Sequence, residues 1–283
     1  MARAPIAGRV AAGAVWTGEE MIVWGGISRT GAIQAESDGA AYARASDAWR
    51  SIASAPSGVL GDVGDAAAWT GTTAVFWAGN SPDGPAAGAV YDPATGAWAR
   101  LPDGPLGPRE GYASVWTGTE LLIVGGTSGD TFALPVAAAV DPSVGSWRLL
   151  AGLNELGPFI PGGVAWDGER LFLAGTQYLC PPEEGFTCTE SRPVFLAYDP
   201  STDRVDEIDR SPAPVGEGGA ASLVSVGWDG ERVVLTTSAG APAGIVLYDP
   251  SADEWQVGAE PPCDPQGDGY EQIAWLGDAL VAP

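Results

Sequence analysis

The stretch V-W-T-G-E-E-M-I-V-W-G-G, residues 15 to 26, decides the fold of this chain. An apolar run ends at Trp16, a polar turn follows at Thr17–Glu19, and a second apolar run, Met21–Trp24, stops at two glycines. Two short apolar runs joined by a turn that contains glycine are the sequence signal of a β-hairpin. The stretch therefore predicts two antiparallel strands.

The same pattern returns along the chain at a period of about fifty residues. The tryptophan that closes the first strand, followed by a turn and an apolar run, recurs at Trp16, Trp69, Trp116, Trp166, Trp228 and Trp275. A second predicted hairpin in each of the first five units ends at Trp49, Trp98, Trp147, Val205 and Trp255. Each unit thus predicts four short strands, a to d in chain order, as in the blades of a β-propeller.

The residues of these units resemble the kelch repeat. Strand b ends in Gly-Gly at Gly25-Gly26 and Gly125-Gly126, and Tyr-Asp-Pro precedes a tryptophan at Asp92–Trp98 and Asp249–Trp255. The likeness covers nearly the whole chain and is closest in wording to bacterial kelch-motif proteins. It implies an all-β fold, a kelch-type β-propeller similar to the central domain of galactose oxidase. The chain departs from the pattern where Gly-Gly is replaced in units two, four and five, and where unit four lacks the second tryptophan.

We expect one propeller domain over residues 1–283, with five complete four-stranded blades and a partial sixth. The blades are expected at residues 8–55, 59–103, 109–151, 159–209 and 220–259, with strands a and b of the sixth blade at residues 270–283. A closed ring leaves no free sheet edge, whereas half a blade exposes one. The pattern therefore predicts a six-bladed ring whose last blade is truncated.

The composition excludes several functions. The 283 residues carry a net charge of −23, all 13 basic residues are arginines, and histidine is absent. A surface this acidic repels nucleic acids and anionic membranes and attracts basic partners. We therefore expect no nucleic-acid partner and no membrane insertion. Without histidine or lysine the chain cannot build a Ser-His-Asp triad, a His-ligated zinc or copper centre, or a Schiff base. Galactose-oxidase-like copper catalysis is thus excluded, and we expect no cofactor and no metal.

The cysteines favour a disulfide in the longest insertion. Cys180 and Cys188 bracket a short loop, and Cys263 is left over. Closing such a loop stabilises a fold by roughly 2–3 kcal/mol in the chain-entropy model. A Cys180–Cys188 disulfide implies an oxidising compartment, so we expect an extracellular or cell-surface protein, although residues 1–10 show no signal-peptide core.

Candidate ligand-binding residues gather at the predicted mouth of the channel. The b–c loops and d–a linkers share one face of a propeller, and variable loops on a rigid scaffold commonly carry binding sites. The position about seven residues before each strand-a tryptophan is expected at the channel entrance on this face. The residues predicted there are Arg9, Asp62, Asp65, Arg109, Glu110, Tyr112, Glu217, Asp268, Tyr270 and Glu271. Charges of both signs beside two tyrosines suit a polar ligand, and they equally suit salt links between blades.

Most of the repeated residues are expected to be structural. The strand-a tryptophans are large apolar side chains that can wedge neighbouring blades together, with sugar stacking as the minor alternative. In the Asp-Pro turns the aspartate can accept a hydrogen bond from the backbone N–H two residues on. This role is predicted for Asp92, Asp141, Asp199 and Asp249.

Three interpretations of the function remain open. The favoured one is a non-catalytic propeller that binds a protein or carbohydrate partner through its b–c and d–a loop face, with no residue assigned as catalytic. The alternative is a carbohydrate-active enzyme, such as a glycosidase, lyase or epimerase, that uses carboxylates and arginine at the channel mouth. The third is a structural module of a larger secreted or cell-surface protein.

Overall fold

The structure is a computed structural model. It describes residues 2–28, 34–59, 66–79, 86–128, 131–132, 136–179, 188, 190–208, 223–237, 245–258, 274–276 and 279–281. These residues are mostly β-strands, and they include one short α-helix, α1 (Ala151–Asn154). The chain divides into two compact units: unit one is Met1–Leu149 and unit two is Leu150–Pro283. The expectation of a single domain stays a prediction.

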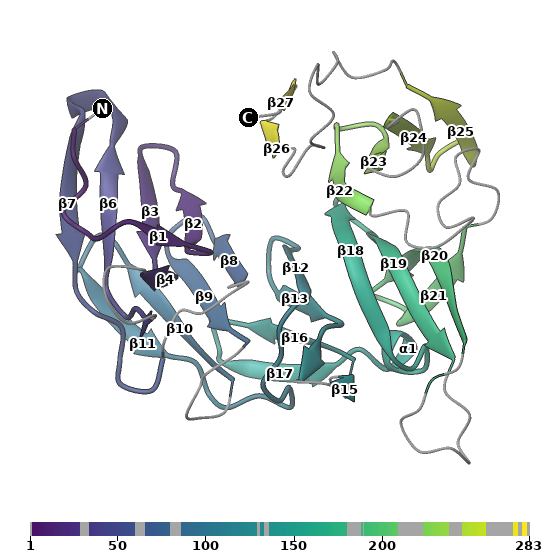
Figure 1. Cartoon of the computed structure of the whole chain (residues 1–283), viewed down its shortest axis with the longest axis horizontal. Coiled ribbons are helices and arrows are strands. Elements are labelled where there is room, and N and C mark those ends of the chain that lie inside the picture. The colour runs from purple at the N-terminus through teal and green to yellow at the C-terminus, as the bar shows by residue number, and fades with distance from the viewer. Residues whose placement is uncertain are drawn as a thin grey trace. The chain divides into compact units, whose positions relative to one another are not determined.

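Unit one contains three four-stranded antiparallel sheets, each paired in the order a-b-c-d that the repeats predict (Figure 1). Blade one consists of β2 (Gly13–Trp16), β3 (Glu20–Trp24), β6 (Gly39–Ala43) and β7 (Ala48–Ile52). Blade two consists of β8 (Ala66–Trp69), β9 (Ala74–Ala78), β10 (Ala87–Asp92) and β11 (Ala97–Arg100). Blade three consists of β12 (Ala113–Trp116), β13 (Leu121–Val124), β16 (Ala137–Asp141) and β17 (Ser146–Leu149).

Unit two contains two further four-stranded sheets with the same order of strands. Blade four consists of β18 (Phe159–Trp166), β19 (Leu171–Leu179), β20 (Glu190–Asp199) and β21 (Arg204–Glu207). Blade five consists of β22 (Leu223–Trp228), β23 (Val233–Thr237), β24 (Ile245–Asp249) and β25 (Glu254–Val257). The two-stranded sheet of β26 (Ala274–Leu276) and β27 (Ala279–Val281) lies where strands a and b of the sixth unit are predicted. The prediction of repeated four-stranded blades is therefore confirmed.

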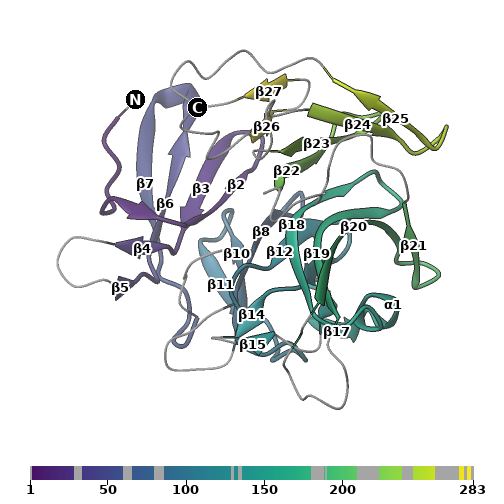
Figure 2. The same ribbon diagram turned by 45° about the vertical axis from the view of Figure 1, so that its right-hand side comes forward.

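Short strands that the sequence did not predict lie in unit one, on its b–c loops and on the linker before strand a of blade one. β1 (Arg9–Val10), β4 (Ile27–Ser28) and β5 (Gln34–Ala35) form a three-stranded sheet, and Figure 2 shows β4 and β5 beyond the end of β3. β14 (Thr127–Ser128) and β15 (Thr131–Phe132) form a two-stranded sheet in blade three. In both blades the linker before strand a pairs with the start of the b–c loop, because Arg9 lies opposite Ser28 and Glu110 opposite Thr127.

The core of each unit lies between neighbouring sheets. In unit one, Ile22 and Trp24 of blade one pack in one cluster with Phe76 and Tyr91 of blade two. A second cluster joins the other face of blade two to blade three. In unit two, side chains of blades four and five form the corresponding cluster. In β9, Ala74 and Phe76 enter the first cluster while Val75 and Trp77 enter the second, so apolar side chains alternate between the two faces as the period of two along a strand requires.

The tryptophans of strands a and b are buried to different degrees. Trp24 and Trp77, both in strand b, are fully buried. The strand-a residues Trp69 and Trp116 are half-buried and pack against the clusters between blades, as predicted, but Trp16 is 49% exposed. The aromatic packing between neighbouring sheets therefore comes more from the tryptophans of strand b than from those of strand a, for which the sequence predicted this role.

The Asp-Pro turns have the predicted hydrogen bonds. The carboxylate of the aspartate accepts a bond of 2.8 Å from the backbone N–H two residues on, in all four turns. These residues are Asp92, Asp141, Asp199 and Asp249. Among the residues that the structure describes, no helix has the length and apolar character needed to span a membrane.

Candidate functional site

Arg9 and Arg109, two of the predicted ligand-binding residues, hold the b–c loops of their own blades. Nη1 of Arg109 donates to the carbonyls of Gly125 (3.1 Å) and Val136 (3.3 Å). Nη1 of Arg9 donates to the equivalent carbonyls of Gly25 (3.0 Å) and Asp38 (3.3 Å). In each blade one carbonyl follows strand b and the other precedes strand c. Each arginine therefore ties together the two ends of a loop.

The burial of Arg109 limits what it can offer to a ligand. Its side chain is 1% exposed, and burial lowers its pKa to about 10, which still leaves the guanidinium charged at neutral pH. Arg9 pairs with the Asp38 carboxylate at 2.7 Å. The observed contacts of both arginines stabilise the blade, and a ligand-binding role for them stays a prediction.

Tyr112 connects the linker of blade three to blade two. Its hydroxyl donates to the carbonyl of Trp77 (3.1 Å) and accepts from the N–H of Ala66 (3.0 Å). Its ring meets that of Trp77 edge-on, with centroids 5.0 Å apart. Glu110 is exposed, and its backbone pairs with Thr127. Arg109, Glu110 and Tyr112 are thus neighbours in sequence, but the Arg109 side chain contacts its own b–c loop whereas Tyr112 contacts blade two.

The other predicted residues lie outside the described part of the chain. They are Asp62, Asp65, Glu217, Asp268, Tyr270, Glu271 and Cys180. Cys188 is disulfide-bonded, but with Cys180 outside the described residues its pairing stays a prediction. Most of the predicted b–c loop face is outside them as well.

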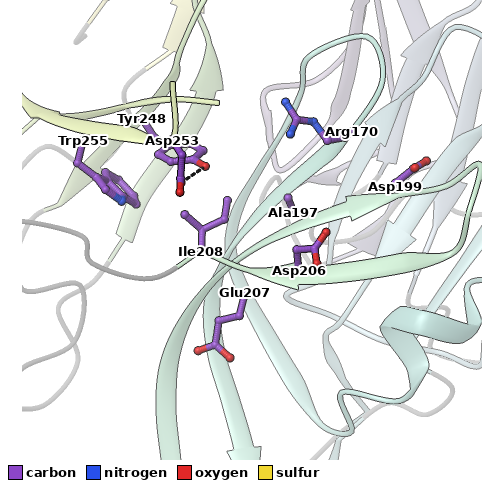
Figure 3. Close-up of a pocket in the computed structure, with 9 residues that line it drawn as sticks. All are labelled: Arg170, Ala197, Asp199, Asp206, Glu207, Ile208, Tyr248, Asp253 and Trp255. Carbon is purple, nitrogen blue, oxygen red and sulfur yellow. Dashed lines mark hydrogen bonds between the residues drawn. The ribbon is translucent and has the colours of Figure 1, made fainter. Parts of the chain in front are cut away.

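A groove that the sequence did not predict lies in unit two, between blades four and five. We call it the blade 4–5 groove; its volume is about 450 Å³. It is lined by Arg170, Ala197, Asp199, Asp206, Glu207, Ile208, Tyr248, Asp253 and Trp255. Figure 3 shows Trp255, Tyr248 and Asp253 on one wall, Ala197, Asp206 and Arg170 on the other, and Ile208 between them. The groove lies beside the a–b and c–d turns, not on the loop face that the sequence favoured.

The floor of the groove is apolar and aromatic. The rings of Tyr248 and Trp255 are 4.9 Å apart, and Ile208 packs against the same cluster. The Tyr248 hydroxyl donates to Oδ1 of Asp253 at 2.9 Å. Burial first, and then this bond to a carboxylate, raise the pKa of Tyr248 to about 12. The tyrosine therefore stays a neutral donor that fixes Asp253 at the rim.

The rim carries four acidic side chains and one arginine. Arg170 is already paired within its own turn, since its Nη2 lies 3.2 Å from Oδ2 of Asp167, and it lies over the Phe172 ring at 5.2 Å. The hydroxyls of Ser201 and Thr202 lower the pKa of Asp199 to about 2. Asp206 and Glu207 form exposed ion pairs with Arg204 and Arg192.

A repeated pair of residues builds the Asp253 wall. The strand-c tyrosine donates to an aspartate five residues later in Tyr42–Asp47, Tyr198–Asp203 and Tyr248–Asp253. All three aspartates have positive φ angles, between 47° and 57°. In the sequence this pair is visible as a Tyr followed by an Asp five positions later. That pattern could have predicted the Asp253 side of the groove.

The groove combines aromatic rings with carboxylates. Within the described ranges, no group of three Cys, Asp or Glu side chains is placed to hold a metal ion. An aromatic floor with acidic groups around it can hold a cationic group by cation–π contact and by charge.

Comparison with known proteins bears on the fold. No protein-family model and no curated protein matches the chain. Among solved structures, 373 chains match, and one of them is the structure of YjhT. It has a TM-score of 0.64 at 12% sequence identity, covering 90% of this chain and 85% of that chain. At this identity the likeness concerns the fold alone, and together with the repeated four-stranded sheets it gives this chain a β-propeller fold.

Proposed function

We propose that the chain is a non-catalytic binding module that holds a basic segment of a protein partner in the blade 4–5 groove. The observation that carries the proposal is the composition of the groove wall, in which four acidic side chains lie around an aromatic floor. Asp206 and Glu207 are in exposed ion pairs with Arg204 and Arg192, and the lining arginine, Arg170, is paired with Asp167. The volume of about 450 Å³ falls within the range of roughly 300–1,000 Å³ typical of ligand pockets.

The charge balance favours a cation over a neutral or anionic ligand. A cation about 4 Å from one carboxylate near a protein surface gains about 4 kcal/mol of Coulomb energy before desolvation. Contact with an indole face adds about 0.5–2 kcal/mol. A neutral ligand gains neither contribution, and an anion is repelled by the net charge of −23. A lysine or arginine side chain combines the charge with an aliphatic stem for the apolar floor.

The alternative of a carbohydrate-active enzyme has no observation in its favour here. The arginines expected at the channel mouth donate to backbone carbonyls of their own blades. The acidic residues expected beside them are mostly outside the described part of the chain.

The test compares two matched variants. A lysine–glycine heptapeptide is titrated into the full chain by calorimetry, with a glutamate–glycine heptapeptide as the negative ligand. Asp253→Asn keeps the acceptor for Tyr248, and asparagine tolerates the positive φ of 53°. Asp203→Asn removes the same charge from the equivalent Tyr198 pair, which does not line the groove.

We expect Asp253→Asn to weaken binding by up to about fivefold, as loss of one exposed ion pair would, and Asp203→Asn to leave it unchanged. Binding should also weaken as NaCl is raised from about 50 to about 500 mM. Equal weakening by both variants would show only general attraction to an acidic surface. Absence of binding to the lysine peptide would contradict the proposal outright.

A further inference from the structure

A second groove, in unit one, has a different chemistry from the first. It lies between the a–b turn of blade one and the a–b and c–d turns of blade two, and its volume is about 680 Å³. We call it the blade 1–2 groove. The residues of its wall that bear on ligand chemistry are Trp69, Thr17, Thr72, Thr73, Glu19 and Asp92. Binding in this groove goes beyond the proposed function, because it needs neither the blade 4–5 groove nor a basic partner.

Trp69 forms a fixed aromatic wall. It closes strand β8 and is half-buried, and it packs against the cluster that joins blades one and two. An indole that is held by the core and also lines a cavity offers a rigid apolar surface without loss of side-chain entropy on binding.

The negative charges of this groove are largely engaged. Arg50 donates two hydrogen bonds to the Glu20 carboxylate, from Nε to Oε1 at 3.2 Å and from Nη2 to Oε2 at 2.6 Å. Asp92 accepts from the N–H of Ala94 and the hydroxyl of Thr95, both at 2.8 Å. Two of the three carboxylates in the lining, those of Glu20 and Asp92, are thus used by the fold itself.

Hydroxyl groups take the place of charge on this wall. Oγ1 of Thr17 accepts from the N–H groups of Glu19 (3.2 Å) and Glu20 (2.9 Å) and retains its own proton to donate. Thr73 shares a hydroxyl–hydroxyl contact of 2.9 Å with Thr70, and Thr72 is exposed at the rim. A hydroxyl can both donate and accept, so the rim matches a ligand that does the same.

We propose that the blade 1–2 groove binds a neutral, pyranose-sized cyclic polyol. The C–H face of such a ring packs on the Trp69 indole, and its hydroxyl groups exchange hydrogen bonds with the threonines and with Glu19. Because the ligand is uncharged, the binding does not depend on salt, unlike the attraction of a cation.

The experiment titrates the full chain with glucose, galactose, mannose and cellobiose, followed by tryptophan fluorescence and by calorimetry, at about 20 and about 500 mM NaCl. Thr72→Val removes the hydroxyl at nearly constant shape. Thr119→Val is the matched control, because Thr119 holds the same place in the a–b turn of blade three and does not line the groove.

We expect at least one sugar to bind saturably in the millimolar range, equally at both salt concentrations. Thr72→Val should weaken it about fivefold or more, since an unpaired polar group on the sugar costs about 1 kcal/mol, whereas Thr119→Val should not. Three results would overturn the proposal: no binding of any sugar, equal binding by Thr72→Val, or salt-sensitive binding of spermidine that Glu19→Gln abolishes. Since the lysine-peptide titration with Asp253→Asn is independent, failure of one site leaves the other testable.

Discussion

The aspartates of the c–d turns hold their turns in the ionised form. Bonds from the neighbouring serine or threonine and from backbone N–H groups lower their pKa below the ordinary 3.8, to about 2 for Asp199. A group whose pKa is lowered by folding stabilises the fold above its unfolded pKa, and this contribution disappears as the pH falls through the folded pKa. The turns should therefore weaken between about pH 4 and pH 2.

The Asp199→Asn variant isolates this contribution from the general effect of acid on a highly charged chain. The difference in urea midpoint between the unmodified chain and the variant should be constant above about pH 4 and shrink toward pH 2. Urea unfolding followed by tryptophan fluorescence at several pH values measures it. A difference that does not change with pH would mean that ionisation of Asp199 has no part in the stability of its turn.

Arg109 is predicted to matter for stability because its partners are buried carbonyls. Arg109→Met should destabilise the fold by about 2–4 kcal/mol, since it leaves the carbonyls of Gly125 and Val136 without this donor. Arg100→Met is the control: Arg100 pairs with the exposed Asp103 at 3.2 Å, and its loss should change stability by less than about 0.5 kcal/mol. Urea unfolding compares the two, and similar losses would contradict a structural role specific to Arg109.

At the scale of the c–d turn, one backbone position has the left-handed conformation in all five blades. Asp47, Asp203 and Asp253 occupy it in blades one, four and five, and Gly96 and Gly145 in blades two and three. Gly96 has a φ of 71°, and a Cβ added there would meet no atom within 4 Å. Only the backbone conformation therefore restricts this position.

Gly96→Asp should change the free energy of unfolding by less than about 1 kcal/mol, because aspartate tolerates this region and can accept from Tyr91 as its counterparts do. Gly96→Val should be worse by at least about 1 kcal/mol, since β-branched side chains are strained at positive φ. Thermal unfolding of both variants tests the prediction. If valine were tolerated as well as aspartate, the turn would not impose the conformation.

The strands could be predicted from the sequence, whereas of the blade 4–5 groove only the Asp253 wall has a local signal, the Tyr–Asp spacing of five residues. Strand order and bounds follow from local patterns, such as the apolar runs around Thr17–Glu19 and the Asp-Pro turns, that each unit repeats. Arg9 and Arg109 donate to backbone carbonyls, and because every residue has a carbonyl, the sequence does not indicate which ones they contact. The blade 4–5 groove joins Arg170, Asp206 and Asp253 from three separate elements, and only the packing of two sheets creates it.

At the scale of the whole molecule, each of the five described four-stranded blades has strands b and c in the middle and strand d at one edge. Strand b is paired on both sides, as β3 is with β2 and β6, whereas strand d has one partner within its sheet. Backbone amides that are paired and buried exchange with solvent only when the structure opens. The edge strands should open at lower free energy than the central ones.

Native-state amide hydrogen exchange, resolved along the full chain, tests this repeated architecture most directly. The account predicts five separate maxima of protection centred on β3, β9, β13, β19 and β23, each falling toward strand d of the same blade. Two results would contradict the four-stranded blade as the unit from which the protein is built. One is protection that shows no such repeat along the chain, and the other is protection that is highest at β7, β11, β17, β21 and β25.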